Sequence, residues 1–538
     1  MQRDGSPHSG HPLVQVTSRP SRRDVLKLGM VAAAGLAGLT SLTACGAVPG
    51  KPDQNAPQQR GGSYSHGATG GGLKDTLEPY FPVTNPDIAR CLQLYEPLLR
   101  WNAQYEIEPS VAESVTPNGD NTQWTIRLRD GVEFHHGKTL TADDVMFSLR
   151  KVTDPEKPGS GGTELSKILE LNNSTIVDPR TIQLQLNQPY AVLDQLLAEY
   201  TVGILPTDFD VSRPVGTGPF SYNRFVPGQL SQFDRFANYW DGPAFVDELI
   251  IYDFADPAAQ VNALLAGQVQ SVDNLPNYLA GTIEQQGASP LVSETGAWVP
   301  FTMRVDAAPF SDVRVRQALR LIVDRQQMID QALNGFGILG NDMYSPFDPA
   351  YAKDLPQRVQ DIDQAKSLLK QAGQENLDVE LVTSSGVGAG AVESANLFVE
   401  QAKKAGVTVR LNKADSGIFY GDRYLSWNFA QDFWNTRNYI PQVASSSVKD
   451  ATYNETHFDD PQFTQLIDQA KRESDEARRN QLLHDAQEIE YNTGGYIIWG
   501  FKRQLDACSN LVQGLEPHRY LPCSNFGFKR ASFVTPPT

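Results

Sequence analysis

Hydrophobic and polar residues alternate strictly over residues 123–132, where Trp124, Ile126 and Leu128 fall on one face. This period of two predicts a strand with one buried side. Thr141 follows, with acidic residues directly after it, a pattern typical of a helix N-terminus. The first half of the chain is therefore expected to contain both strands and helices.

In the second half of the chain, helical and strand-like patterns alternate. A helix is predicted to begin at Ser311 or Asp312, because apolar residues recur at Val315, Leu319 and Ile322. We expect the arginines of this helix to be solvated. The following segments are predicted as a helix at 363–372, a strand at 379–383, a helix at 392–405 and a strand at 407–411. Such alternation is typical of an α/β lobe.

The most distinctive stretch of the chain is 215–272. It begins with a glycine turn, Gly216-Thr217-Gly218-Pro219-Phe220, and continues with three predicted strands and one amphipathic helix that ends at Gly267. This order resembles the signature region of the family 5 extracellular solute-binding proteins, the peptide and nickel receptors of ATP-driven importers. The run Pro309-Phe310-Ser311-Asp312-Val313-Arg314-Val315-Arg316-Gln317-Ala318-Leu319 is similar to the one that starts the first helix of the large lobe in that family.

The resemblance covers nearly all of residues 62–533 and implies the fold class. We expect an α/β, two-lobed periplasmic-binding-protein-like fold of the class II type, with mixed sheets flanked by helices and an extra small inserted lobe. The expected parts are a signal peptide at 1–44, a flexible tether at 45–61, a first lobe from 62–99, 206–300 and 511–538, the inserted lobe at 100–205 and a second lobe at 301–510. In such receptors the lobes close around a solute, and the closed form docks on a membrane permease.

The N-terminal residues have the pattern of an export signal. Arg22-Arg23 form a twin-arginine pair before an apolar stretch at 28–44, which is too short and too rich in small residues for a comfortable membrane span. The stretch ends in Leu42-Thr43-Ala44-Cys45-Gly46, the pattern of a lipoprotein cleavage site. We expect twin-arginine export and a lipid on Cys45, which would anchor the protein to the outer face of the cell membrane.

Charge narrows the choice of partners. The formal net charge of −17 argues against binding of nucleic acid or of an anionic membrane surface through bulk charge. Outside the leader no apolar run is long enough to span a bilayer. The expected partners are a small-molecule or peptide ligand and the membrane subunits of an ABC permease, and the protein is expected to be a monomer.

The sequence predicts no enzyme, no cofactor and no metal site. The motifs Gly-x-Ser-x-Gly and His-Glu-x-x-His and a Walker loop are absent from it. His135 and His136 are adjacent on a predicted strand, so they point to opposite faces. His457 lies near Glu455, Asp459 and Asp460, but Asp459-Asp460-Pro461 is typical of a helix N-terminus. Two alternatives stay open: a secreted hydrolase, which would turn over peptides or glycosides, and a structural envelope lipoprotein, which no ligand would stabilise.

Besides Cys45, the chain has three cysteines. An exported chain can keep disulfides, and Cys508 and Cys523 flank residues 511–521 near the C-terminus. We predict that these two pair and that Cys91 is a buried thiol in the first helix. The alternative is that all three are small apolar core residues.

The candidate ligand-binding residues gather around one segment of the second lobe. The predicted set consists of Asn85, Trp427, Asp432, Trp434, Asn435, Arg437, Tyr439 and Trp499. Peptide receptors of the resembled family carry an acidic residue three places after a tryptophan, shortly before a proline, and it binds the amino terminus of the peptide. Matching Trp434 and Pro441 to that pattern places Arg437 at the position of the acid.

This replacement reverses the charge at one expected ligand contact. An arginine there disfavours a free ammonium group and can grip a carboxylate or phosphate through two parallel hydrogen bonds. The alternative is that Arg437 pairs with Asp432 and only stiffens the loop. Under the first interpretation Trp434, Tyr439 and Trp499 form an apolar or stacking wall. The ligand is then a peptide-like, oligosaccharide or acidic solute.

Overall fold

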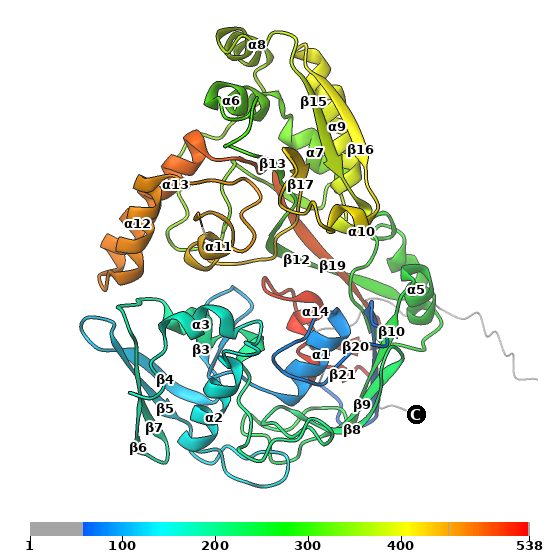
Figure 1. The fold of residues 1–538 in the computed structure, drawn as a ribbon. Helices are drawn as coiled ribbons and strands as arrows, with labels where there is room; N and C mark the ends of the chain where they lie inside the picture. Colours follow the sequence, from blue (N-terminus) through cyan, green and yellow to red (C-terminus); the bar gives the residue numbers. More distant parts are fainter. Residues whose placement is uncertain (1–56, 450, 536–538) are drawn as a thin grey trace, which may run out of the picture. The chain divides into compact units, whose positions relative to one another are not determined.

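The structure is a computed structural model that describes residues 57–449 and 451–535. Its first sheet has eight strands and mixes parallel with antiparallel pairs (Figure 1). The strand order is β12 (Ala288–Trp298), β19 (Gly500–Ser509), β11 (Ser271–Val272), β1 (Ser63–Thr69), β10 (Glu248–Phe254), β9 (Leu230–Arg235) and β8 (Phe220–Val226), and β14 (Gly337–Leu339) pairs with β19. The helices associated with this part are α1 (Asn85–Leu94) and α5 (Pro257–Leu265).

A separate antiparallel sheet is built from residues 112–185. Its order is β4 (Ala112–Pro117), β5 (Gln123–Leu128), β7 (Thr181–Gln185) and β6 (Thr175–Asp178). Trp124, Ile126 and Leu128 are all buried, which confirms the predicted half-buried strand. The helix α2 (Ala142–Val152) begins after Thr141, as predicted, and the Asp144 carboxylate accepts a hydrogen bond from the Thr141 N–H. The neighbouring elements are β2 (Leu99–Trp101), β3 (Ile107–Pro109), α3 (Gly162–Ile168) and α4 (Leu193–Leu197).

The third sheet belongs to the second half of the chain. Its order is β16 (Thr408–Lys413), β15 (Asp378–Thr383), β17 (Phe429–Gln431), β13 (Phe301–Met303) and β18 (Tyr496–Ile497). The surrounding helices are α6 (Val313–Ile322), α7 (Arg325–Ala332), α8 (Ile362–Gln371), α9 (Ala391–Lys404), α10 (Ser416–Phe419), α11 (Tyr439–Ser446), α12 (Pro461–Arg472) and α13 (Glu476–Thr493). The C-terminal residues form β20 (Val512–Gln513), α14 (Pro522–Asn525) and β21 (Ser532–Phe533). In 57–449 and 451–535 we find no helix whose length and apolar character would let it cross a membrane.

Two crossings of the chain between the first and third sheets lie next to each other, and the short strand β14 adds a return to the first sheet beside them, where it pairs with residues 500–502 of β19. The chain leaves β12 at Trp298 to enter β13, and it returns from β18 to β19 at Gly500. Trp298 is the register partner of Phe501, so the two crossings run side by side. The expected second-lobe range 301–510 is therefore wrong at its end, because β19 is hydrogen-bonded into the first sheet. A single apolar run cannot reveal at which residue the chain changes sheets.

The glycine turn before β8 is required by close packing against α1. A Cβ atom on Gly216 would lie 1.9 Å from the carbonyl oxygen of Leu94, and one on Gly218 would lie 2.2 Å from that of Gln93. The N–H of Gly218 donates to the same Leu94 carbonyl at 3.0 Å. No side chain fits at either position, which explains the glycines of this motif.

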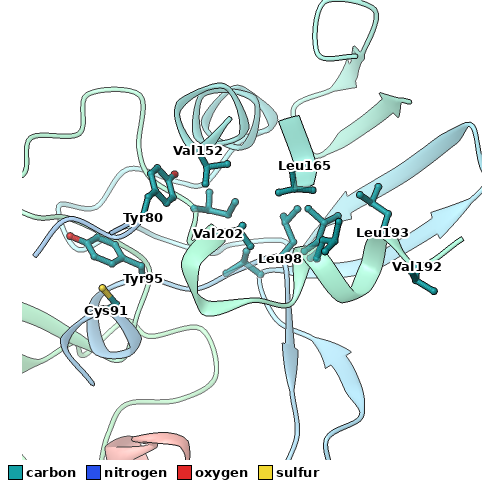
Figure 2. Close-up of a cluster of buried hydrophobic side chains, with 14 of the residues drawn as sticks. Tyr80, Cys91, Tyr95, Leu98, Val152, Leu165, Val192, Leu193 and Val202 are labelled. Carbon is teal, nitrogen blue, oxygen red and sulfur yellow. The ribbon is translucent and has the colours of Figure 1, made fainter. Parts of the chain in front are cut away.

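Apolar side chains join α1 to the inserted sheet region. Tyr80, Tyr95, Val152 and Val202 pack into one buried cluster, which Figure 2 shows. Cys91 lies in the same cluster as a buried free thiol, as predicted. The inserted region is thus held to the first sheet by a continuous apolar core and not only by its connections.

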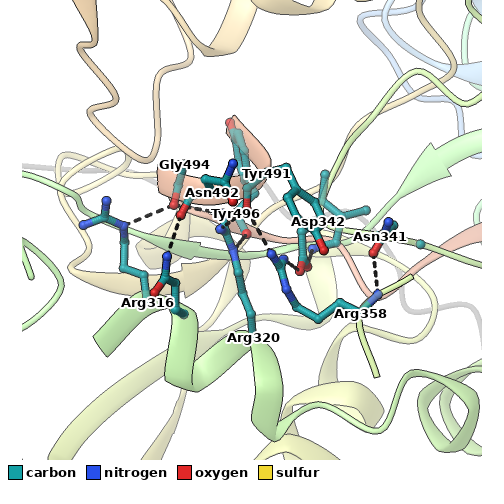
Figure 3. A network of polar contacts seen from close by, with 12 residues as sticks. Arg316, Arg320, Asn341, Asp342, Arg358, Tyr491, Asn492, Gly494 and Tyr496 are labelled. Atoms are coloured by element: carbon teal, nitrogen blue, oxygen red, sulfur yellow. Dashed lines mark hydrogen bonds and ion pairs between the residues drawn. The ribbon is translucent and has the colours of Figure 1, made fainter. Parts of the chain in front are cut away.

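The arginines of α6 are not solvated as predicted: Arg316 and Arg320 are buried (Figure 3). Arg320 donates to the carbonyl oxygens of Tyr496, Tyr491 and Gly494 at 2.9, 2.8 and 2.9 Å. These carbonyls lie at or just beyond the C-terminus of α13, where the last turn has no intrahelical donors. The guanidinium groups satisfy this helix end, a role that the sequence of α6 alone cannot show.

We expect Arg320→Ala to lower the free energy of unfolding by ~3 kcal/mol or more, because several buried carbonyls lose their donors. The measurement is urea unfolding followed by circular dichroism. Arg314→Ala is the matched control on the same helix, since Arg314 is exposed and solvent screens its ion pair with Asp312. Equal losses in both variants would contradict the assigned role of Arg320.

Candidate functional site

The carboxyl ends of two parallel strands meet in the second lobe. β15 and β17 run parallel, and the Thr383 hydroxyl at the end of β15 donates to Gln431 at the end of β17 at 2.6 Å. Directly after β17 the chain continues through Asp432 and Phe433 to Trp434. Ligands of open α/β sheets bind at such strand ends, so this edge is the first place to look for a site.

A small pocket lies at this edge, with a volume of about 10 Å³. Its walls include the aromatic side chains of Phe419, Tyr424 and Trp427, and both Asp432 and Glu455 line it. The volume is that of roughly one water molecule or one group of similar size. The pocket can therefore receive one end of a solute but not a whole one.

The two carboxyl groups of the pocket are buried, with Asp432 3% and Glu455 5% exposed. Asp432 accepts hydrogen bonds from the Tyr424 hydroxyl and the Phe433 N–H, each at 2.8 Å. Glu455 accepts from the Trp434 indole at 2.9 Å and from the Tyr496 hydroxyl. In residues 57–449 and 451–535, neither carboxyl forms an ion pair.

Burial governs the protonation of both groups. It raises the pKa of Asp432 to about 6, against the opposing hydrogen bonds from the Phe433 N–H and Tyr424. Burial together with the nearby Asp432 carboxyl raises the pKa of Glu455 to about 8. Two carboxyl groups this close disfavour each other's ionisation, so at neutral pH the pair holds a proton.

The segment after Asp432 is fastened to the strand that crosses between the sheets. Trp434 and Trp298 exchange two backbone hydrogen bonds of 3.0 Å, and their rings stack with centroids 6.1 Å apart. The Thr436 hydroxyl accepts from the Gly296 N–H and donates to the Arg519 carbonyl, both at 2.9 Å. The Tyr105 hydroxyl donates to the Thr436 carbonyl at 3.3 Å. Residues 434–436 thus touch β12, the C-terminal segment and the loop before β3.

Arg437 presents an exposed guanidinium group next to this junction. It donates to the Ser445 hydroxyl at 2.9 Å and lies 5.6 Å from the centroid of the Trp434 ring. Burial raises the pKa of Glu199, and a Tyr520 hydrogen bond and the charge of Arg437 oppose that rise. Within the described part of the chain Arg437 makes no ion pair with Asp432, so the stiffened-loop alternative lacks its predicted contact.

The structure brings Trp427, Asp432 and Trp434 together and places Asn85 elsewhere. Trp427 and Asp432 line the pocket, Trp434 lies beside it, and Asn435 is exposed. Asn85, at the start of α1, donates to the Asp273 carboxylate of the first lobe at 2.7 Å. Ligand contact by these residues and by Arg437 stays a prediction.

Two predicted ligand residues are core residues instead. Tyr439 is fully buried, and its hydroxyl donates to Glu490 at 2.5 Å while its N–H donates to Asp348. Trp499 is buried in the apolar core around Leu319 and Phe398. Both predictions are wrong for the same reason: an aromatic residue in an apolar run has the same appearance in a core as in a cleft.

The sequence alone does not mark three residues of this region as part of the candidate site: Tyr424, Thr436 and Glu455. Glu455 was grouped with the acidic residues before α12, whose helix N-cap is Asp460, as predicted. His457 contacts Asp306 at 3.2 Å and the Leu425 carbonyl at 2.9 Å. Among the described residues no group of three potential metal ligands occurs. Only the burial of Glu455, which its local sequence does not reveal, distinguishes it from its solvated neighbours.

The predicted disulfide is not formed in the structure, where Cys508 and Cys523 are free thiols. The two side chains are nevertheless neighbours, since their mutual hydrogen bond and burial raise the pKa of Cys523. Cys523 also lies 3.9 Å from Nδ1 of His66, whose pKa burial lowers to about 3. Pairing under oxidising conditions therefore stays a prediction.

A larger pocket of about 350 Å³ is lined by residues of the first lobe and of the inserted region 100–205, and it has no wall from residues 301–499. Arg100, Lys529 and Arg530 line it, and each is already paired, with Glu108, Asp241 and Glu516 respectively. By size, this larger pocket is the better candidate for a ligand site. The smaller pocket is the stronger candidate by its position at parallel strand ends and by its two buried carboxyls, Asp432 and Glu455, which have no counterion among the described residues.

These features are those of a two-lobed α/β protein with a candidate site at strand ends, and comparisons with known proteins identify the class. Residues 106–452, more than half of the chain, match the model of the bacterial extracellular solute-binding proteins, family 5. The chain therefore belongs to this family, the solute-binding proteins of ABC importers. Its members are binding proteins that work outside the cytoplasm, which confirms the expectation that the chain is not an enzyme.

Named relatives span different solutes. Heme-binding protein A of Haemophilus influenzae is 28% identical over 75% of this chain and 81% of its own length. The glutathione-binding protein GsiB of Shigella flexneri is 23% identical over 85% of this chain and 92% of its own length.

Solved structures confirm the fold class. DppA of Helicobacter pylori, in complex with the peptide STSA, has a TM-score of 0.74 at 21% identity and covers 89% of this chain and 99% of its own. The substrate-binding protein CtaP of Listeria monocytogenes has a TM-score of 0.80 at 19% identity, with 89% and 100% covered. At these identities the likeness shows the fold and not the ligand.

The buried carboxyls predict how stability changes with pH. A carboxyl whose pKa is higher in the folded than in the unfolded chain costs stability once the unfolded chain ionises, above pH ~4.5. Burial raises the pKa not only of Glu455 to about 8 but also of Glu490 and Asp506 to about 7. The free energy of unfolding of the wild type should therefore fall between pH 5 and pH 8.

Glu455→Gln should make this decline shallower, because the neutral amide has no charge to desolvate. Urea unfolding at several pH values measures the slope. Glu400→Gln is the control, since Glu400 is exposed and pairs with Lys403 on the surface of α9. A slope in Glu455→Gln equal to that of the wild type would show that Glu455 is ionised in the folded protein.

Proposed function

We propose that the protein is a lipid-anchored, extracytoplasmic receptor that delivers a small solute to the permease of an ABC importer. Two lobes, made from residues 62–99, 206–300 and 500–538 and from residues 301–499, close around the solute, and residues 100–205 form an inserted lobe. The observation that best supports this proposal concerns segment 434–437. The segment is hydrogen-bonded to β12, the strand that leads into the second lobe, and it exposes the guanidinium group of Arg437. Ligand contact with this segment is thereby coupled to the relation between the lobes.

Arg437 supports a choice of ligand chemistry. Its exposed guanidinium can form two parallel hydrogen bonds to a carboxylate, and the indole of Trp434 beside it supplies a flat apolar surface. DppA binds the peptide STSA, and AgaA of A. tumefaciens R10, a solved structure 24% identical to this chain, binds agropinic acid. The fold therefore accepts quite different solutes, and the side chains select among them. We propose a solute with a carboxylate or another strongly hydrogen-bonding group that faces Arg437.

The test is calorimetry of the wild type and Arg437→Ala with sugar acids, oligosaccharides, and peptides with free or blocked amino termini. Affinity for the acidic solute should fall tenfold or more in Arg437→Ala, because a charged hydrogen bond is lost. Arg410→Ala serves as control, since Arg410 pairs with Asp378 on the exposed edge strand β16. Tight binding of free-amine peptides that blocking abolishes and that Arg437→Ala leaves unchanged would overturn this choice.

The proposed anchoring concerns residues 1–56, which lie outside the described residues, and rests on the sequence pattern. Cys45→Ala should release the protein from the membrane or block its maturation, as measured by fractionation and by mass spectrometry of the N-terminus. Replacing Arg22 and Arg23 by Lys should stall export. Export of that double variant at the normal rate through the general secretion route would refute the twin-arginine assignment.

A further inference from the structure

The pocket at the end of β17 contains buried acceptors but no cation. Asp432 and Glu455 both line it, and in residues 57–449 and 451–535 no Lys, Arg or His forms an ion pair with either. The residues whose contacts surround the two carboxyls are neutral donors: Tyr420, Tyr424, Trp434 and Tyr496. Buried carboxylates in proteins are usually paired or coordinated. A positively charged group is the chemistry that this pocket lacks.

A third acceptor independently points into the same pocket. The side chain of Thr302 lines it, and Thr302 is only 2% exposed. Within the described part of the chain its hydroxyl has no hydrogen-bond partner, unlike that of Thr383 two strands away, which donates to Gln431. Thr302 is the register partner of Ala430, another lining residue, so both side chains lie on the pocket face of the sheet. The Thr302 oxygen is not fully enclosed, so it can form a hydrogen bond with a group that enters the pocket.

The pocket matches one cation in size and in hydrogen-bonding capacity. A primary ammonium group is about as large as a water molecule and donates three hydrogen bonds, and the pocket offers two carboxyls and one hydroxyl in a volume of about 10 Å³. The aromatic wall adds a second attraction, because ring faces attract cations. The guanidinium group of Arg423 lies over the ring of Trp427, 3.9 Å from its centroid, so this ring already takes part in one cation–π contact.

We infer that the pocket formed by Thr302, Asp432 and Glu455 binds a primary ammonium group of the transported solute, an inference that rests on the proposed receptor function. With Arg437 nearby on the same segment, the solute then carries an amine and an acid at different ends. Because burial raises the pKa of Glu455 to about 8, binding of the ammonium at neutral pH displaces a proton from the carboxyl pair. The proton passes to the buffer, and no covalent bond is made or broken.

The test uses methylammonium chloride as the probe and tetramethylammonium chloride as the comparator, since the latter has no N–H and exceeds the pocket in size. Thermal-shift titrations of the full chain should give a saturable stabilisation by methylammonium only. The apparent affinity should fall about tenfold or more in Asp432→Asn and Glu455→Gln, and severalfold in Thr302→Val. Calorimetry in two buffers should show proton release in the wild type at pH 7 and none in Glu455→Gln.

Glu400→Gln is the control and should bind methylammonium as the wild type does. Each variant is first checked by its melting curve without added amine, and Ala430→Val, which narrows the pocket without changing charge, should also weaken binding. Equal effects of the two salts, or an unchanged affinity in Glu455→Gln, would overturn the inference. If methylammonium does not bind while acidic solutes still bind through Arg437, the ammonium subsite is refuted and the proposed receptor function is not.

Discussion

The pairing of β12 with β19 is the constraint on which both lobes depend. These two strands hydrogen-bond from Ala288 opposite Ser509 to Trp298 opposite Phe501, and the chain passes from β12 to β13 and from β18 to β19 where they end. Trp434 is bound to Trp298 by two backbone hydrogen bonds at this same point. A displacement of the second lobe about these strands therefore acts directly on the segment that carries Arg437.

Buried charge is used in two opposite ways within the second lobe. Around α13, Arg316 and Arg320 donate to carbonyls at the helix C-terminus, and the buried carboxylate of Asp342 pairs with Arg325 and Arg358 (Figure 3). Such groups stiffen the lobe because removing any member leaves a buried partner unsatisfied. At the end of β17, by contrast, Asp432 and Glu455 have hydrogen bonds but no counterion. A hydrogen-bonded framework next to a carboxyl pair without a counterion is the arrangement expected where a framework presents a binding site.

The family and the fold class followed from the sequence because they rest on local patterns. The alternation at 123–128, the capped helix α2 and the turn at Gly216 and Gly218 each depend on residues close in sequence, and all appear as predicted. The helix α6 was also predicted correctly, whereas the burial of its arginines was not. That burial depends on α13, which begins more than 150 residues later in the chain.

For the candidate site, the sequence by itself determined the segment 427–437 and the charge of Arg437, since a motif and its departure from a pattern are visible in one dimension. Only the tertiary structure decided which side chains of that region face a pocket. It moved Tyr439 and Trp499 into cores and brought Thr302 and Glu455, over 150 residues apart, to the same cavity as Asp432. Burial and proximity set the pKa of a carboxyl and the value of a hydrogen bond. Burial and proximity are results of tertiary packing, so they cannot be read from the order of residues along the chain.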